Sequence, residues 1–218
     1  MDQKEILGNQ EVHWNQKFTQ NMDMFGTEPS NPAKKTLEVY QSEKASRILE
    51  LGAGQGRDTI YFAKNDLQVD VLDYSPEGVN AILQKAETAK LAKMVSAQCH
   101  DVRKPLPYKD QSFDGCYSHM LFCMAFSTQE LEQLCEEVRR VLKPGGLCIY
   151  TVRHTGDADY QNGVHRGEDL WESGGFIVHF FDRQKVQHLA KGFEIVDIEE
   201  FEEGKLPRKL FRVTLRKL

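Results

Sequence analysis

Three glycines at alternate positions follow a short apolar run and constrain this chain more than any other feature. The run is Arg47–Leu51, and the glycines are Gly52, Gly54 and Gly56. A glycine turn between a strand and a helix brings backbone close to a ligand and points unpaired helix N–H groups at it. We therefore predict a strand over 47–51, a ligand-binding turn, and a helix from about Arg57 to Ala63.

Apolar runs alternate with helical patterns along the rest of the chain. The further strands that we expect are 69–73, 94–99, 113–117, 147–152, 193–202 and 209–217. Ser75 and Thr128 are expected to cap two of the intervening helices. This alternation predicts an α/β fold, a Rossmann-like doubly wound sheet that is mostly parallel. The last two strands follow each other without a long connection, which predicts an antiparallel hairpin at one end of the sheet.

The length of 218 residues suits one domain. Within it we expect a helical N-terminal cap segment, a ligand-binding core, a polar loop on the substrate side, and a closing helix and hairpin. Their expected ranges are 1–45, 46–153, 154–175 and 176–218. The loop shows no periodicity, and a long loop without structure of its own is more often a lid than a connector.

Charge and cysteine content narrow the classes of partner. The net charge of −5 gives no basic field that would favour nucleic acid. The basic residues of 208–217 alternate with apolar ones, as on the wet face of a strand. No run of about 18 apolar residues could span a membrane, and the N-terminus lacks a signal-peptide core. Five scattered cysteines without a Cys-x-x-Cys pair predict free thiols, no metal site and a cytoplasmic location.

Three carboxylates surround the predicted turn. Glu50 precedes it, Asp73 ends the next strand, and Asp101 follows the third strand. A strand-end carboxylate such as Asp73 can accept hydrogen bonds from both hydroxyls of a ribose, although it could also be a simple helix cap. Carboxylates repel a pyrophosphate but attract a sulfonium or an ammonium. The third glycine also comes one residue earlier than in the dinucleotide fingerprint, so S-adenosylmethionine (SAM) is favoured over NAD.

Taken together, these motifs resemble those of class I SAM-dependent methyltransferases. The matching features are Glu50-x-Gly-x-Gly-x-Gly, Asp73, Asp101-Val102, Phe113-Asp114 and Leu142-Lys-Pro-Gly-Gly146. The resemblance implies a seven-stranded sheet whose last strand is antiparallel. It also implies cofactor-binding roles for Glu50, Gly52, Ala53, Gly54, Asp73, Tyr74, Asp101, Val102 and Ser118. The small-molecule branch, which includes methyltransferase types 11 and 25 and the tellurite- and thiopurine-type enzymes, is the most similar.

Ligands of open α/β sheets bind beyond the carboxyl ends of the strands. This rule directs attention to His119 after the fourth strand and to His154 after the fifth. We take His154 as the candidate base or substrate contact, against a plain surface role. Trp14 and Phe18 could cover the cofactor or pack in the core.

A small-molecule methyl acceptor is therefore expected, with no nucleic-acid or membrane partner. A non-catalytic SAM-binding protein, an NAD(P)-dependent oxidoreductase and a methyltransferase acting on nucleic acid or protein stay as alternatives. The sequence leaves the acceptor and the oligomeric state open.

Overall fold

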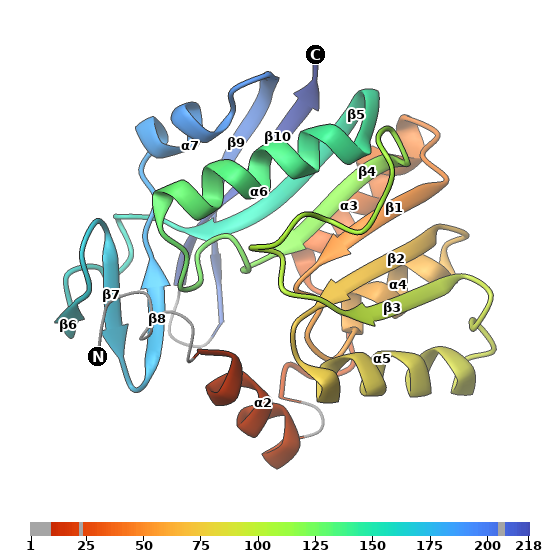
Figure 1. Ribbon diagram of the computed structural model, residues 1–218, viewed down its shortest axis with the longest axis horizontal. Helices are drawn as coiled ribbons and strands as arrows, with labels where there is room; N and C mark the ends of the chain where they lie inside the picture. The colour runs from red at the N-terminus through yellow and green to blue at the C-terminus, as the bar shows by residue number, and fades with distance from the viewer. Residues whose placement is uncertain (1–9, 22–23, 205–207) are drawn as a thin grey trace.

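A seven-stranded sheet forms the centre of the computed structural model, which describes residues 10–21, 24–204 and 208–218 (Figure 1). Its strand order is β3-β2-β1-β4-β5-β10-β9. The strands are β1 (Arg47–Leu51), β2 (Gln68–Asp73), β3 (Val95–Cys99), β4 (Phe113–His119), β5 (Leu142–Arg153), β9 (Phe193–Glu203) and β10 (Arg208–Lys217). The first five pair in parallel, and β10 is antiparallel to both its neighbours. The predicted doubly wound sheet and its closing hairpin are confirmed.

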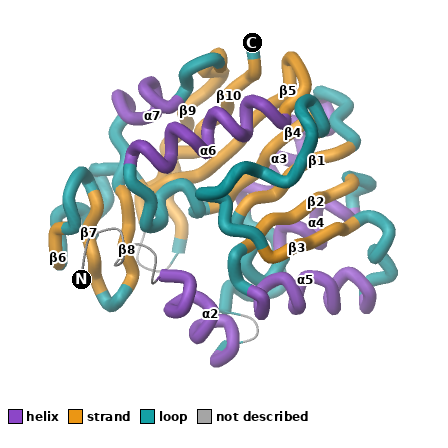
Figure 2. The backbone as a smooth tube through the Cα atoms, viewed as in Figure 1, coloured by secondary structure: helices purple, strands orange, loops and turns teal. Residues whose placement is uncertain are grey.

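Helices cover both faces of this sheet (Figure 2). One face carries α3 (Asn31–Ser42), α4 (Arg57–Lys64) and α5 (Pro76–Thr88), and the other carries α6 (Thr128–Val141) and α7 (Arg183–Leu189). Each helix buries one apolar stripe, such as Leu131, Leu134 and Val138 on α6. The sheet thus lies between two apolar cores. Because its two faces are covered, a ligand has to bind at the ends of the strands.

The helix starts follow from short polar side chains. Ser75 caps α5 as predicted, because its Oγ accepts a hydrogen bond from the backbone N–H of Gly78. The predicted cap Thr128 is wrong by one residue. Ser127 has the extended backbone of an N-cap, and it exchanges hydrogen bonds with Glu130 in a capping box.

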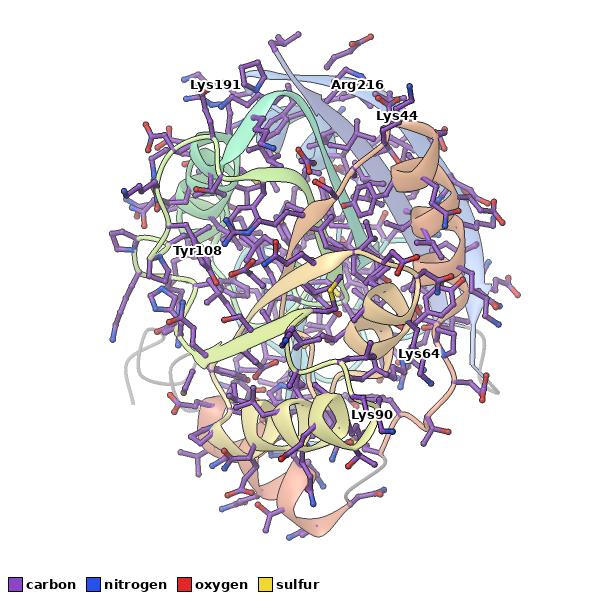
Figure 3. All side chains as sticks on the ribbon, turned by 90° about the vertical axis from the view of Figure 1, so that its right-hand side faces the viewer. Lys44, Lys64, Lys90, Tyr108, Lys191 and Arg216 are labelled. Atoms are coloured by element: carbon purple, nitrogen blue, oxygen red, sulfur yellow. The ribbon has the colours of Figure 1, made fainter. Side chains whose placement is uncertain are left out.

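Two basic residues of the C-terminal strand pair with acidic neighbours. Arg212 of β10 bonds to Glu199 of β9, and Arg216 bonds to Glu43. Other charged side chains, among them Lys64, Lys90 and Lys191, project from the surface (Figure 3). None of the described helices combines the length and apolar character that crossing a bilayer requires.

The segment expected to be an unstructured loop forms part of a second, three-stranded sheet. Its strands are β6 (Val164–His165), β7 (Leu170–Ser173) and β8 (Phe176–His179), which pair in that order. Gly174 and Gly175, both with positive φ, form the tight turn between β7 and β8. Strands of two to four residues are too short to give a visible period, which is why sequence pattern missed them.

This small sheet and helix α2 (Gln10–Gln20) lie beyond the carboxyl ends of β1, β4 and β5 (Figure 1). Gln10 joins the two, because its side chain donates to the carbonyl of Gly175 at 3.1 Å. Helix α2 and the β7–β8 hairpin therefore both lie at the carboxyl ends of these central strands.

Candidate functional site

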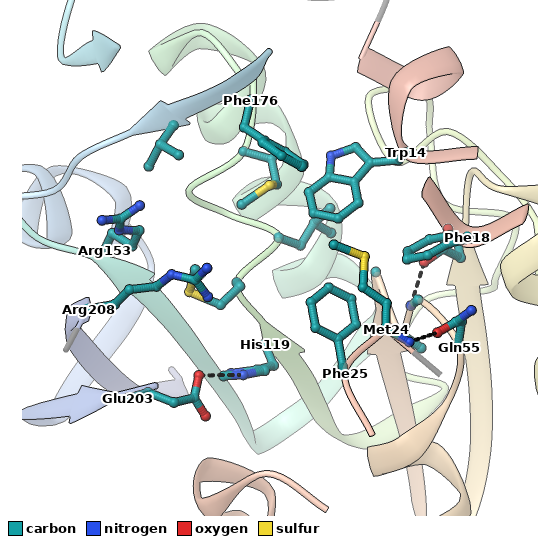
Figure 4. Close-up of a pocket in the computed structure, with 18 of the residues that line it drawn as sticks. Trp14, Phe18, Met24, Phe25, Gln55, His119, Arg153, Phe176, Glu203 and Arg208 are labelled. Carbon is teal, nitrogen blue, oxygen red and sulfur yellow. Dashed lines mark hydrogen bonds and ion pairs between the residues drawn. The ribbon is translucent and has the colours of Figure 1, made fainter. Parts of the chain in front are cut away.

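A cavity of about 370 Å³ lies at the carboxyl ends of β1, β4 and β5. One half is lined by the glycine turn and buried carboxylates: Glu50, Gly52, Ala53, Gly54, Gln55, Asp58 and Asp73. The other half is lined by residues of α2, of the ends of β4 and β5 and the segments after them, and of the β7–β8 and β9–β10 hairpins. These residues are Trp14, His119, Met120, Arg153, Asp159, Trp171, Phe176, Glu203 and Arg208 (Figure 4). We call these the turn half and the far half.

The backbone of the turn requires its glycines. Gly52, Gly54 and Gly56 have φ values of 69°, 56° and 80°, a left-handed region that other residues rarely adopt. A Cβ on Gly52 would also lie 2.9 Å from the Cβ of Leu121. A fourth glycine supports the turn from outside, because a Cβ on Gly78 of α5 would lie 2.6 Å from the carbonyl oxygen of Gly54.

Asp73 ties the turn to the end of β2. Its Oδ2 accepts from the backbone N–H of Gly54 at 2.8 Å, and its Oδ1 accepts from that of Ser75 at 2.9 Å. Burial raises the pKa of Asp73 to about 6, although these backbone hydrogen bonds counteract it. Each carboxylate oxygen has a second acceptor site, so hydroxyl groups in the cavity can still bind there.

Glu50 is buried at the end of β1 and is 3% exposed. Its Oε2 accepts a hydrogen bond of 2.6 Å from the hydroxyl of Thr59. Burial, followed by the charge of Asp58, raises the pKa of Glu50 to about 8. The carboxyl group is therefore mostly neutral at pH 7 and would ionise readily beside a cation.

A narrower hollow of about 40 Å³ adjoins the cavity. It is lined by Tyr74, Asp101, Val102 and Gln10 of α2, and it shares Asp73 with the cavity. Oδ1 of Asp101 accepts from the backbone and the guanidinium of Arg103. Burial opposes this charge, but the hydrogen bonds from Arg103 keep the pKa of Asp101 below its ordinary value. Its other oxygen has no hydrogen bond within the described structure, so it can accept one from a ligand.

Ser118 lies one layer below the cavity. It is buried, does not line the cavity or the hollow, and donates to the carbonyl of Leu51 at 3.1 Å. In this geometry Ser118 supports the last residue before the glycine turn. Its expected cofactor-binding role stays a prediction.

The turn also holds the N-terminal cover in place. The side chain of Gln55 accepts from the N–H of Met24 at 3.0 Å and donates to the carbonyl of Asn21 at 2.8 Å. Arg57 donates to the carbonyl of Phe25 at 2.9 Å. The main chain after α2 is thus bonded directly to the ligand-binding turn.

An aromatic cluster closes the space above the turn. Trp14 packs against Phe18, Phe25 and Phe176, with ring centroids 5.7, 6.4 and 5.1 Å apart. Trp14 and Phe18 both line the cavity, and Phe18 is also buried, while covering a cofactor stays a prediction.

His154 does not line the cavity. Its ring stacks on Phe211 with centroids 4.5 Å apart, and its Nδ1 accepts from the N–H of Gly156. Burial lowers its pKa. His154 directly follows β5, where its N–H donates to the carbonyl of Lys209 and its ring lies on Phe211, so the side chain faces β10 and not the cavity.

His119 occupies the position at the end of β4 and lines the far half. Its Nδ1 lies 2.8 Å from the hydroxyl of Thr151, which accepts from the N–H of Met120. Its Nε2 lies 3.3 Å from Oε2 of Glu203 (Figure 4). Burial opposes ionisation of Glu203, yet the hydrogen bond with His119 and the neighbouring positive charges hold its pKa below the ordinary value. The ionised Glu203 accepts, which places the ring proton on Nε2 and the lone pair on Nδ1.

The strand-end rule pointed to His119, but no sequence signal pointed to Glu203. It belongs to the closing hairpin, 84 positions along the chain from His119, and only the insertion of β10 beside β5 brings the two together.

Comparison with known proteins agrees with this architecture. Residues 48–146 match a family model described as a methyltransferase domain. Phosphoethanolamine N-methyltransferase 1 of Triticum aestivum is 34% identical over 113 residues, which are 50% of this chain and 22% of that protein. 24-methylenesterol C-methyltransferase 2 of Oryza sativa subsp. japonica is 26% identical over 150 residues, which are 63% of this chain and 39% of that protein. The chain thus spans well under half the length of these relatives.

Among solved structures, 1,6-didemethyltoxoflavin-N1-methyltransferase of Burkholderia thailandensis superposes with a TM-score of 0.76 at 16% identity. The superposition covers 100% of this chain and 91% of that one. That crystal structure holds 1,6-didemethyltoxoflavin and S-adenosylhomocysteine (SAH). At this level of identity the likeness concerns the fold.

Proposed function

Because residues 48–146 match a methyltransferase-domain model, we propose that this chain is a class I SAM-dependent methyltransferase and transfers a methyl group from SAM to a small-molecule acceptor. One observation carries the proposal: a single cavity has a glycine turn with buried carboxylates in one half and aromatic side chains with a histidine–glutamate pair in the other. Two ligands of different chemistry can meet there.

The residues of the turn half fit SAM. The left-handed glycines leave room for a ligand against the backbone, Asp73 can accept from the ribose hydroxyls, and Glu50 would face the ammonium group. Tyr74, Asp101 and Val102 in the adjoining hollow would hold the adenine. When bound, the sulfonium supplies an electrophilic methyl group whose departure leaves a neutral thioether.

The protein then has to align the acceptor and exclude water. The cluster around Trp14 and the hydrogen bonds from Gln55 to the N-terminal segment would serve the second task. Such a cover preserves the electrostatic field of the sulfonium, because charges interact more strongly away from water.

His119 is the proposed proton acceptor for an acceptor atom that loses a proton. In this structure Nδ1 faces the hydroxyl of the buried Thr151, which the acceptor group would have to displace to give up its proton there. Glu203 at Nε2 would stabilise the imidazolium that forms. This role replaces the one expected of His154, whose ring is stacked away from the cavity.

Calorimetry tests the donor first. We expect wild-type protein to bind SAM and SAH and not NAD, because the carboxylates of the turn half would repel a pyrophosphate. Binding of NAD or NADP in place of SAM would establish the oxidoreductase alternative.

Turnover is tested with a panel of small amines, phenols and carboxylic acids, followed by release of SAH. Failure of every acceptor, with SAM binding intact, would favour a non-catalytic SAM-binding protein. Tight binding of RNA at physiological salt would favour a nucleic-acid substrate.

A reducing compartment such as the cytoplasm suits the cysteines. Cys116 and Cys148 are neighbours in the β4–β5 register, yet both are free thiols. Labelling of denatured protein, purified without reductant, should find five thiols per chain, and fewer would argue against this location.

A further inference from the structure

Three arginines line the cavity, and two of them are already engaged. Arg57 donates to the carbonyl of Phe25, and its Nε lies 3.9 Å from Asp58. Arg153 bonds to Asp157 and to Asp159, the latter at 2.6 Å, so two carboxylates offset its charge. Neither guanidinium is free to receive a second anion at full strength.

Arg208 is different. It begins β10 and lines the far half. Its side chain makes no hydrogen bond or ion pair with any part of the chain that the structure describes. Its partner in the strand register is Glu203, but that carboxylate is directed to His119. Figure 4 shows the side chain of Arg208 reaching from the hairpin toward the space between Arg153 and His119.

The positive charge of Arg208 lowers the pKa of two other side chains. It helps to hold the pKa of Glu203 below its ordinary value, after the contribution of His119. Burial raises the pKa of Cys123, beneath this wall, to about 11, and Arg208 is among the charges that counteract the rise.

Another part of the cavity wall is apolar and aromatic. Phe176 and Trp14 meet edge to face at 5.1 Å, and Val178, Trp171 and Phe180 continue the same wall. Arg208 is exposed, so water reaches its guanidinium, and an anion bound there would gain mainly from charge-assisted hydrogen bonds. Its planar fork matches the two oxygens of a carboxylate or phosphate.

We infer that the methyl acceptor carries an anionic oxygen group, a carboxylate or a phosphate, which binds Arg208 while an apolar body lies against Trp14 and Phe176. This inference rests on the proposed methyl transfer and specifies its second substrate. Glu203 and His119 lie beside the same arginine, so the acceptor atom would sit near the proton acceptor when the anion is bound.

Binding of simple probes tests the inference without knowledge of the natural acceptor. Protein saturated with SAH is titrated calorimetrically with benzoate, phenyl phosphate and neutral benzamide. We expect at least one anion to bind wild type about tenfold or more tightly than benzamide, the effect of one charged hydrogen-bonded contact. The tighter of the two anions identifies the carboxylate or the phosphate as the preferred group.

Substitutions assign the effect to one side chain. Arg208→Gln should reduce binding of the anion to the level of benzamide, and Arg208→Lys should retain part of the preference. Arg216→Gln is the matched control, because this arginine lies at the other end of β10 and pairs with Glu43. SAH affinity should stay unchanged in all three variants.

Equal affinity of the anions and benzamide, no binding of either anion, or an unchanged anion affinity in Arg208→Gln would overturn the anionic acceptor. Failure of wild type to bind SAH would instead overturn the proposed function, so the two failures are distinct.

Discussion

Oδ2 of Asp73 accepts a hydrogen bond from the backbone N–H of Gly54 across 2.8 Å, joining the end of β2 to the middle of the glycine turn. The carboxylate that is expected to bind the ribose therefore also sets the position of the backbone against which SAM would lie. Changes at Asp73 should act on ligand contact and on turn geometry together.

Replacement of Asp73 separates these roles. Asp73→Ala removes both backbone hydrogen bonds and any bond to a ribose, so SAH affinity should fall by about 1–3 kcal/mol, roughly five- to 150-fold. Asp73→Asn keeps one acceptor oxygen and should lose less. Calorimetry measures the change, with Asp197→Asn, exposed on β9, as the control. Unchanged affinity in Asp73→Ala would reduce the residue to a helix cap.

Glu50 should make the stability of the free protein depend on pH. Its pKa of about 8 in the folded state lies above the ordinary 4.5. The folded protein then binds the proton that the unfolded chain releases, so stability is fullest below about pH 4.5 and declines until about pH 8. Glu50→Gln, which cannot ionise, should gain over wild type by about 1.4 kcal/mol per pH unit within that window.

Urea unfolding at pH 5.5 and 7.5 measures this gain. Glu87→Gln, exposed on α5, should show no such trend. The same Glu50→Gln variant should bind SAM more weakly, because the ammonium loses its counter-charge. A constant difference between variant and wild type across the two pH values would contradict the burial argument.

Substitutions of the two histidines that follow strands should have opposite effects on turnover. His119→Gln should lower turnover of a protic acceptor by about a hundredfold and leave SAH affinity nearly unchanged, as general-base loss does. His154→Gln should retain turnover, because its ring packs on Phe211 outside the cavity. The reverse pattern, with loss only at His154, would restore the assignment made from sequence.

The N-terminal cover should govern how long the product stays bound. Trp14→Ala removes ring contacts with Phe18, Phe25 and Phe176, a loss of about 1–2 kcal/mol. We expect SAH to dissociate about tenfold faster in surface plasmon resonance. Val12→Ala, exposed on the same helix, is the control, and equal dissociation rates in both variants would assign Trp14 to packing alone.

The elements that sequence predicted well have strong local patterns. The apolar run before Gly52, the cap at Ser75 and the stripe on α6 each determine their element through nearby residues. The sheet 164–179 was missed, because its strands are too short for a period and depend on one another.

The two halves of the site differ in the same way: the turn half has a local sequence pattern, and the far half has none. The turn half comes from one continuous motif and two strand ends, so sequence predicted Glu50 and Asp73. The far half is assembled from distant segments, and Arg208 and Glu203 enter it only through the hairpin. Pairing over long sequence distances carries no local signal, and the sequence does not show that the ring of His154 stacks on Phe211 of β10.

Gly78 shows that the motif is larger than its three glycines. It lies outside the turn, on α5, with an ordinary helical backbone, and a substitution there would look harmless on a helical wheel. Yet one added methyl group would meet the carbonyl of Gly54 at 2.6 Å. In a mutational scan Gly78 should therefore be as intolerant as the turn itself, and a search pattern for such chains gains selectivity by requiring glycine three positions after the cap serine.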